Sequence, residues 1–134
     1  MQEVQLSEKE IREGFEKAKE WIRKNIPEFA PYVSEPTLEI GRFQEGWDIS
    51  YSIKERKIMV NLRVVEWYLQ REKRFRISPK FDIETALIHE LFEYCYMRKW
   101  NCDENDRTLV KLVHLRARAL ENQLRKERGL RPWF

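Results

Sequence analysis

Residues 81–99 decide the fold, and they read Phe-Asp-Ile-Glu-Thr-Ala-Leu-Ile-His-Glu-Leu-Phe-Glu-Tyr-Cys-Tyr-Met-Arg-Lys. Apolar residues occupy most positions around a helix of 3.6 residues per turn, which predicts a helix that is buried on most sides. Ser78 is suited to cap this helix, and Pro79 suits its first turn. We therefore expect the stretch to form a large part of the core.

An amphipathic helix is predicted near the N-terminus. Ser7 and Glu10 have the spacing of a capping box, which marks the start of a helix. Pro27 and Pro31 mark its end. Apolar residues recur between these limits with the helical period, at Ile11, Phe15, Ala18, Ile22 and Ile26.

Three segments with alternating apolar residues follow, and each predicts a strand with one apolar face. The first lies around Leu38 and Ile40, the second runs through residues 47–53, and the third through residues 58–62. The polar turn of residues 54–57 joins the last two. We expect a three-stranded, mainly antiparallel sheet, followed directly by a short helix that contains Val64, Trp67 and Tyr68.

A last helix is predicted over residues 106–128, with Gly129 and Pro132 as its stop signals. The short polar loop of residues 101–105 makes this helix fold back antiparallel to the helix of residues 81–99. No repeat or second domain is evident. The sequence thus predicts a single α+β domain over residues 1–134.

Composition limits the classes to which the chain can belong. With 134 residues, 42% of them apolar, the chain can build a core without disulfides. It has no apolar run long enough for a membrane span and no pattern of a secretory signal. Two cysteines, Cys95 and Cys102, are too few for a disulfide scaffold, and their pairing stays open. We therefore expect a cytoplasmic protein, either a monomer or a small homo-oligomer.

Charged residues make up 37% of the chain, but the net charge is only +3. The abundance of Glu, Lys and Arg is typical of proteins from hot environments, in which ion-pair networks are favoured. The basic cluster of residues 71–76 is interpreted as a solvated helix end and loop. Nucleic acid binding through this cluster is the least favoured functional hypothesis.

Two acids and an imidazole lie in the middle of the apolar helix. His89 and Glu93 are four residues apart, so both project from one face and can bind one metal ion. Glu90 is rotated by about 100° from His89, which suits a base that takes a proton from a metal-activated water. Buried carboxylates need compensation, which either a dication or Arg and Lys partners can supply.

A third ligand must come from another element. His114 lies in the next helix, and it and Glu93 are at similar distances from the connecting loop, so we expect them at the same height. Two imidazoles and one carboxylate with an open position are typical of catalytic Zn²⁺ sites, and other divalent transition metals suit them as well. The alternative for His114 is a boundary histidine bonded to a backbone carbonyl.

Glu121 lies two turns beyond His114, about 10 Å along the helix axis, so both residues can hardly bind one ion. We predict that Glu121 instead orients one of the two histidines. The alternative is a surface ion pair with Arg118 or Arg125.

Other residues are less informative. Cys95 lies about 240° around the helix from His89, so it is expected to pack in the core. Tyr96 returns to the His89 face and either lines the site or belongs to the core. Leu130, Trp133 and Phe134 are apolar and are expected to dock on the body or to meet a partner.

The segment Ile88-His89-Glu90-Leu91-Phe92-Glu93, followed by His114 and Glu121, resembles small zincin-like metallopeptidase domains, including phage-encoded ones. Those domains use H-E-x-x-E in place of the commoner H-E-x-x-H, with a downstream histidine on the next helix. The resemblance covers residues 83–124. It implies a minimal zincin-like fold and a peptide or protein substrate, with His89, Glu93 and His114 as zinc ligands and Glu90 as the base.

Two main hypotheses follow for function. The first is a zinc-dependent, peptidase-like hydrolase that uses a metal-activated water. The second is a non-catalytic, zincin-shaped binding module that works through partners, with or without a metal. Hydrolysis that depends on Glu90 separates the first from the second.

Overall fold

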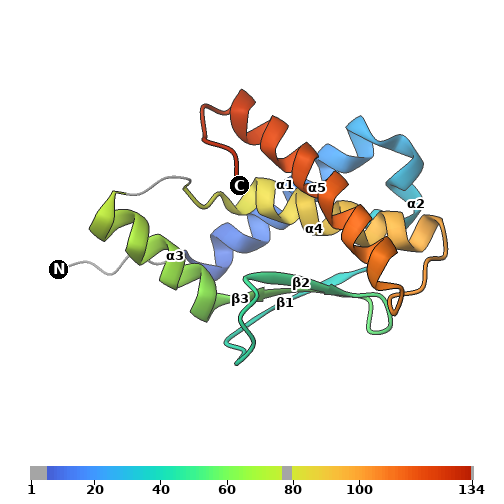
Figure 1. Ribbon diagram of the computed structural model, residues 1–134, viewed down its shortest axis with the longest axis horizontal. Helices are drawn as coiled ribbons and strands as arrows, with labels where there is room; N and C mark the ends of the chain where they lie inside the picture. The colour runs from blue at the N-terminus through green and yellow to red at the C-terminus, as the bar shows by residue number, and fades with distance from the viewer. Residues whose placement is uncertain (1–5, 77–79, 134) are drawn as a thin grey trace.

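The structure, a computed structural model, describes residues 6–76 and 80–133 and has an α+β architecture, as predicted (Figure 1). Ser78, Pro79 and Phe134, for which the sequence suggests roles, lie outside the described residues. The helices are α1 (Glu8–Asn25), the short η1 (Pro27–Phe29) and α2 (Ala30–Val33), α3 (Leu62–Phe75), α4 (Ile83–Lys99) and α5 (Arg107–Glu127). The strands are β1 (Thr37–Gly41), β2 (Ile49–Ser52) and β3 (Lys57–Asn61).

Helix α1 begins as its sequence predicts. The Ser7 side chain accepts a hydrogen bond from the backbone N–H of Glu10, 3.1 Å away. The helix ends at Asn25, before Pro27, and its apolar stripe is buried against α4. Residues of α1, the sheet and α4 therefore share one apolar core, which includes Phe15, Ile58 and Leu91.

The sheet has three strands in the order β1-β3-β2. Strand β3 pairs antiparallel with β2 but parallel with β1, so the predicted mainly antiparallel sheet is wrong and the sheet is mixed. Period-two alternation is the same in both kinds of pairing, which is why the sequence pattern cannot distinguish them. The order leaves β2 at one edge of the sheet, beside α4.

Helix α4 is the central element, and it packs against α1, α2, α5 and β2. The side chain of Asp82 caps it by accepting a hydrogen bond from the N–H of Thr85, 3.0 Å away. The sequence-based prediction of Ser78 as the cap is therefore wrong, because the helix starts only at Ile83. Helix α5, capped by Asp106, runs antiparallel to α4 as predicted.

The loop of residues 42–48 leads into β2 and is held by side chains at the start of α3. The buried amide of Asn61 donates to the carbonyls of Glu45 and Trp47, both 3.0 Å away. Arg63 donates to the carbonyls of Phe43 and Glu45. Residues 47 and 48 are thereby fixed at the edge of the sheet that faces α4.

The basic cluster of residues 71–76 lies at the C-terminal end of α3, where its basic side chains are exposed, as predicted. The interpretation as a solvated helix end is thus confirmed for its position. None of the described helices combines the length and the apolar character that crossing a membrane requires.

Candidate metal centre

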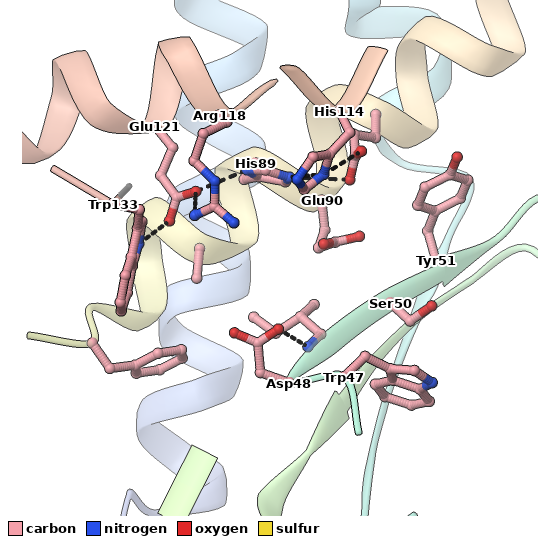
Figure 2. A pocket seen from close by; sticks show the side chains of 14 residues that line it. Trp47, Asp48, Ser50, Tyr51, His89, Glu90, His114, Arg118, Glu121 and Trp133 are labelled. Atoms are coloured by element: carbon pink, nitrogen blue, oxygen red, sulfur yellow. Dashed lines mark hydrogen bonds and ion pairs between the residues drawn. The ribbon is translucent and has the colours of Figure 1, made fainter. Parts of the chain in front are cut away.

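A pocket of about 300 Å³ lies between α4, α5 and β2, and both histidines of the chain line it (Figure 2). Aromatic and acidic side chains form much of the remaining wall. The lining residues are Trp47, Asp48, Ile49, Ser50, Tyr51, Phe81, Ala86, His89, Glu90, Glu93, His114, Arg118, Glu121 and Trp133.

The structure brings together the three residues that the sequence suggests as metal ligands. His89 Nε2 lies 3.2 Å from His114 Nδ1 and 3.2 Å from Glu93 Oε2, whereas His114 Nδ1 lies 3.2 Å from the other oxygen, Glu93 Oε1. One ligand atom from each of the three residues, which together form the triangle, lies within 4.8 Å of the others. The side chains of His89 and Glu93 are 4% and 5% exposed, whereas that of His114 is 46% exposed. The triangle is therefore closed on its α4 side and open to solvent at His114.

The spacing of the donor atoms fits a transition metal ion. Zinc in tetrahedral geometry, with ligands at about 2.05 Å, holds neighbouring donor atoms about 3.3 Å apart. The two imidazole nitrogens are 3.2 Å apart, close to this value, and a carboxylate oxygen of Glu93 lies within 4.8 Å of both. Imidazole and carboxylate donors suit Zn²⁺ and related divalent ions. The three residues thus offer donor atoms of the kind that such an ion prefers, close to one another in space.

Glu121 contacts His89, which is the contact that the predicted orienting role of Glu121 requires. Its Oε1 lies 2.8 Å from His89 Nδ1, and because a carboxylate only accepts, Nδ1 carries the proton. This fixes the ring so that Nε2 faces Glu93 and His114. Glu121 also pairs with Arg118, 2.9 Å away. The alternative of a surface ion pair is wrong, because Glu121 is only 3% exposed and this pair is formed beside the contact to His89.

Carboxylates on both sides of its ring control the titration of His89. Burial on its own would lower the pKa of His89, but hydrogen bonds to Glu121 and Glu93 outweigh it and raise the pKa to about 10. Without an ion, both ring nitrogens are therefore protonated near neutral pH. A metal ion at Nε2 takes the place of one of these protons.

The two acids of the motif have opposite electrostatic environments. Burial opposes ionisation of Glu93, but hydrogen bonds from His114 and His89 outweigh it and lower its pKa. Burial and the nearby carboxylate of Glu93 raise the pKa of Glu90 well above its usual value. Figure 2 shows Glu90 extending from α4 into the space above β2. Glu93 is thus an ionised ligand candidate, and Glu90 is a proton acceptor candidate.

Sequence reasoning misses several side chains of this pocket. Asp48 directly precedes β2, and burial raises the pKa of its carboxyl group. Tyr51 belongs to β2, and burial together with Glu93 and Glu90 raises the pKa of its phenol, which keeps it neutral. Neither has a sequence signal, because only the fold brings β2 to α4. Trp133 docks on the body, one of the two outcomes proposed for it.

Two further residues of α4 lie away from the centre. Tyr96 does not line the pocket but packs against Phe92 and Trp100, so its role as a lining residue is wrong. The core role proposed as the alternative fits its position. Cys95 is buried in the core as predicted, and both it and Cys102 are free thiols.

The chain matches no protein-family model, no curated protein and no solved structure. Its function is therefore inferred from the geometry and chemistry of this centre.

Proposed function

We propose that the protein is a zincin-like hydrolase that binds a divalent transition metal ion, with Zn²⁺ as the expected ion and a peptide bond as the target. The observation that carries this proposal is the group of His89, Glu93 and His114, whose ligand atoms lie within 4.8 Å of one another, together with the buried carboxylate that contacts His89. That combination of ligands and orienting partner is typical of catalytic zinc sites. Two free cysteines suit work in the cytoplasm.

Each side chain around the centre has a chemical role in this proposal. A bound ion would polarise a water molecule and a substrate carbonyl. Glu90 would accept the proton of that water and pass it to the leaving amine, for which its raised pKa is suited. The neutral phenol of Tyr51 and the guanidinium of Arg118, both in the pocket wall, can donate hydrogen bonds to the developing oxyanion.

The sheet offers a place for an extended substrate. Strand β2 pairs with β3 on one side only and contacts α4, which carries the proposed site. A peptide that added to this edge as a further strand would run past Glu90 and His114. Such binding uses main-chain hydrogen bonds, so it requires a peptide in extended form.

Metal content tests the first half of the proposal. Protein purified without a metal-affinity tag or chelator and then incubated with Zn²⁺ should hold about one ion per chain by elemental analysis. His89→Ala and His114→Ala should each lose it. Arg98→Met, which changes a charged residue of the same helix outside the pocket, is the matched control and should keep it. A parent protein without metal would overturn the proposal.

Hydrolysis tests the second half. The zinc-loaded parent should cleave members of a library of extended peptides. Glu90→Gln should lower the cleavage rate at least about 100-fold, the lower end of the range for loss of a general base. Metal content must stay at the parent level in this variant, because Glu90 is not proposed as a ligand. Equal turnover in Glu90→Gln and the parent would exclude this mechanism.

A non-catalytic binding module is the second candidate, and the contacts of the cluster favour it in one respect. Every member of the triangle has a hydrogen-bond partner inside the cluster, so the cluster can be satisfied by protons alone. This candidate predicts no hydrolysis of any peptide and unchanged partner binding in Glu90→Gln.

A further inference from the structure

The segment that follows α5 is turned back towards the metal centre by the end of the helix. Gly129, at φ +74°, adopts the left-handed conformation that favours glycine, and its N–H donates to the carbonyl of Lys126. The N–H of Leu130 donates to the carbonyl of Arg125, 2.8 Å away. These two bonds form a Schellman motif, which closes the helix and reverses the chain direction.

Side chains of α5 then fix the returning segment. The buried guanidinium of Arg125 donates to the carbonyl of Arg131 and lies 4.5 Å from the ring of Trp133. Asn122 bonds the backbone of Trp133 in both directions, because its amide donates to the carbonyl and its oxygen accepts from the N–H. The position of Trp133 is thus determined by several independent contacts.

These contacts bring the indole N–H of Trp133 onto Glu121. Nε1 of the indole donates to Glu121 Oε2 at 2.9 Å, while Oε1 of the same carboxylate faces His89 Nδ1 and Arg118 (Figure 2). Glu121 is only 3% exposed. Both of its oxygens therefore have donors, and the carboxylate cannot rotate without breaking bonds in a buried place.

We propose that Trp133 is a positioning residue of the metal centre, acting on the ion through Glu121 and His89; this inference rests on the proposed function. By holding Oε2, the indole keeps Oε1 on His89 Nδ1, which keeps the proton on that nitrogen and directs Nε2 at the ion. A purely structural role would need only the ring, which phenylalanine also offers. The aimed N–H is what distinguishes the two roles.

Trp133→Phe tests this role, because it keeps an aromatic ring and removes the donor. Its zinc dissociation constant, measured by chelator competition, should rise by up to about tenfold, the lower end of the range for outer contacts of metal ligands. Glu121→Gln, one contact nearer the ion, should raise it by about 10- to 100-fold. Trp100→Phe, the same change at an exposed tryptophan outside the pocket, should leave it at the parent value.

The double variant Trp133→Phe/Glu121→Gln shows whether the indole acts through the carboxylate. If it does, the double variant should bind zinc no more weakly than Glu121→Gln alone, since the effects of residues in one network are not additive. Effects that multiply in full would contradict action through Glu121. Nitrogen NMR of His89 in the metal-free protein is a further measurement. Trp133→Phe should change the chemical shifts of the His89 ring nitrogens if the indole acts through Glu121, whereas a role in packing alone should leave them unchanged.

The parent protein supplies a test that needs no folded variant. The indole N–H resonance of Trp133 should shift when zinc is added, while that of Trp100 should not. A parent that binds zinc, with this resonance unmoved and Trp133→Phe at the parent affinity, would overturn the positioning role and leave the metal site standing. A parent that binds no zinc would overturn both.

Discussion

Helix α4 carries two polar clusters on different sides, and they differ in how their charges are balanced. The Glu35 cluster consists of Glu35, Tyr94 and Arg98 and joins α4 to the segment after α2. The histidine cluster consists of His89, Glu93, His114 and Glu121 and joins α4 to α5. The Glu35 cluster links residues that are 59 or more positions apart, whereas the histidine cluster links two consecutive helices and lines the pocket described above.

The Glu35 cluster is complete as it stands. Arg98 reaches both oxygens of Glu35, at 2.7 and 3.1 Å, and the hydroxyl of Tyr94 donates to the same carboxylate at 3.0 Å. One cation meets one anion, and a neutral donor fills a remaining lone pair. The hydrogen bond from Arg98 is the main reason why the pKa of Glu35 is lowered. Nothing further is required from solvent.

The histidine cluster has an excess of acid. Glu93 and Glu121 belong to it, Glu90 lies beside it, and Arg118 is the one guanidinium among the described residues of the pocket wall. With neutral histidines and all three carboxylates ionised, Arg118 balances one of three negative charges, and protons or a divalent cation must supply the rest. We infer from this difference that charge balance, more than burial, separates a polar cluster that only links elements from one that is suited to bind an ion.

The largest expected effect is stabilisation by zinc. At free zinc about 100 times the dissociation constant, binding to the folded state adds about 2.7 kcal/mol to the free energy of unfolding. His114→Ala should lose this increment, because one of the three ligands is removed. Calorimetric melting with zinc and with chelator measures the increment in each protein.

Arg98→Met breaks the other cluster and is the control for this measurement. Its metal-free form should be less stable by about 1–2 kcal/mol, since Glu35 loses its charged partner at a partly exposed site. The full zinc increment should nevertheless remain. If zinc stabilised His114→Ala as much as the parent, His114 would not be a ligand of the ion.

The next effect is competition between the ion and a proton. Because the pKa of His89 is about 10, the metal-free centre holds a proton at Nε2 near neutral pH, and zinc must displace it. Raising the pH removes this competitor, so binding should tighten by up to about tenfold per pH unit below pH 10. Calorimetry in buffers of different ionisation enthalpy should detect about one proton released at pH 7. Proton release near zero, with an affinity independent of pH, would contradict this assignment.

Helical geometry explains how much of the histidine cluster could be predicted from sequence. The spacing of His89 and Glu93, the short loop to His114 and the two further turns to Glu121 are enough to place these residues near one another. The Glu35 cluster has no such signal, because Glu35 lies in an irregular segment 59 residues from Tyr94. Contacts made within or between neighbouring helices are thus predictable, whereas contacts across the fold are not.

The same limit applies to the strands and to the pocket wall. Alternation predicted three strands correctly, but not the parallel pairing of β1 with β3. That pairing goes with the path of the loop of residues 42–48, which Asn61 and Arg63 hold by contacts across the fold. Asp48 and Tyr51 join the site only because β2 is the edge beside α4. A sequence pattern counts Trp133 only as an apolar residue. The role of its indole N–H can be recognised only in the structure, where it donates to Glu121.

The smallest expected effect gives the clearest contrast between the two regions. Replacing Glu by Gln should lower the free energy of unfolding in the Glu35 cluster and raise it beside the histidine cluster. The folded pKa of Glu35 is lowered, so its ionised form stabilises the fold above pH 4.5, and this stability is lost as pH falls through the folded pKa. Glu35→Gln should therefore cost about 1 kcal/mol at pH 7, a value reduced for partial exposure. The folded pKa of Glu90 is raised, so its ionisation destabilises the metal-free fold as pH rises above 4.5.

Glu90→Gln should accordingly stabilise the metal-free protein at pH 7, by about 1 kcal/mol, because the amide avoids the cost that burial and the nearby Glu93 impose on a carboxylate here. Urea unfolding with a chelator at pH 7 and at pH 4 measures both variants, and the two differences from the parent should shrink together at the lower pH. If both substitutions destabilised the protein equally at pH 7, the ionised form of Glu90 would stabilise the fold as that of Glu35 does, which would contradict the prediction. The proposed role of Glu90 in proton transfer requires a carboxylate at this position, beside the proposed metal site, even though it lowers the stability of the metal-free fold.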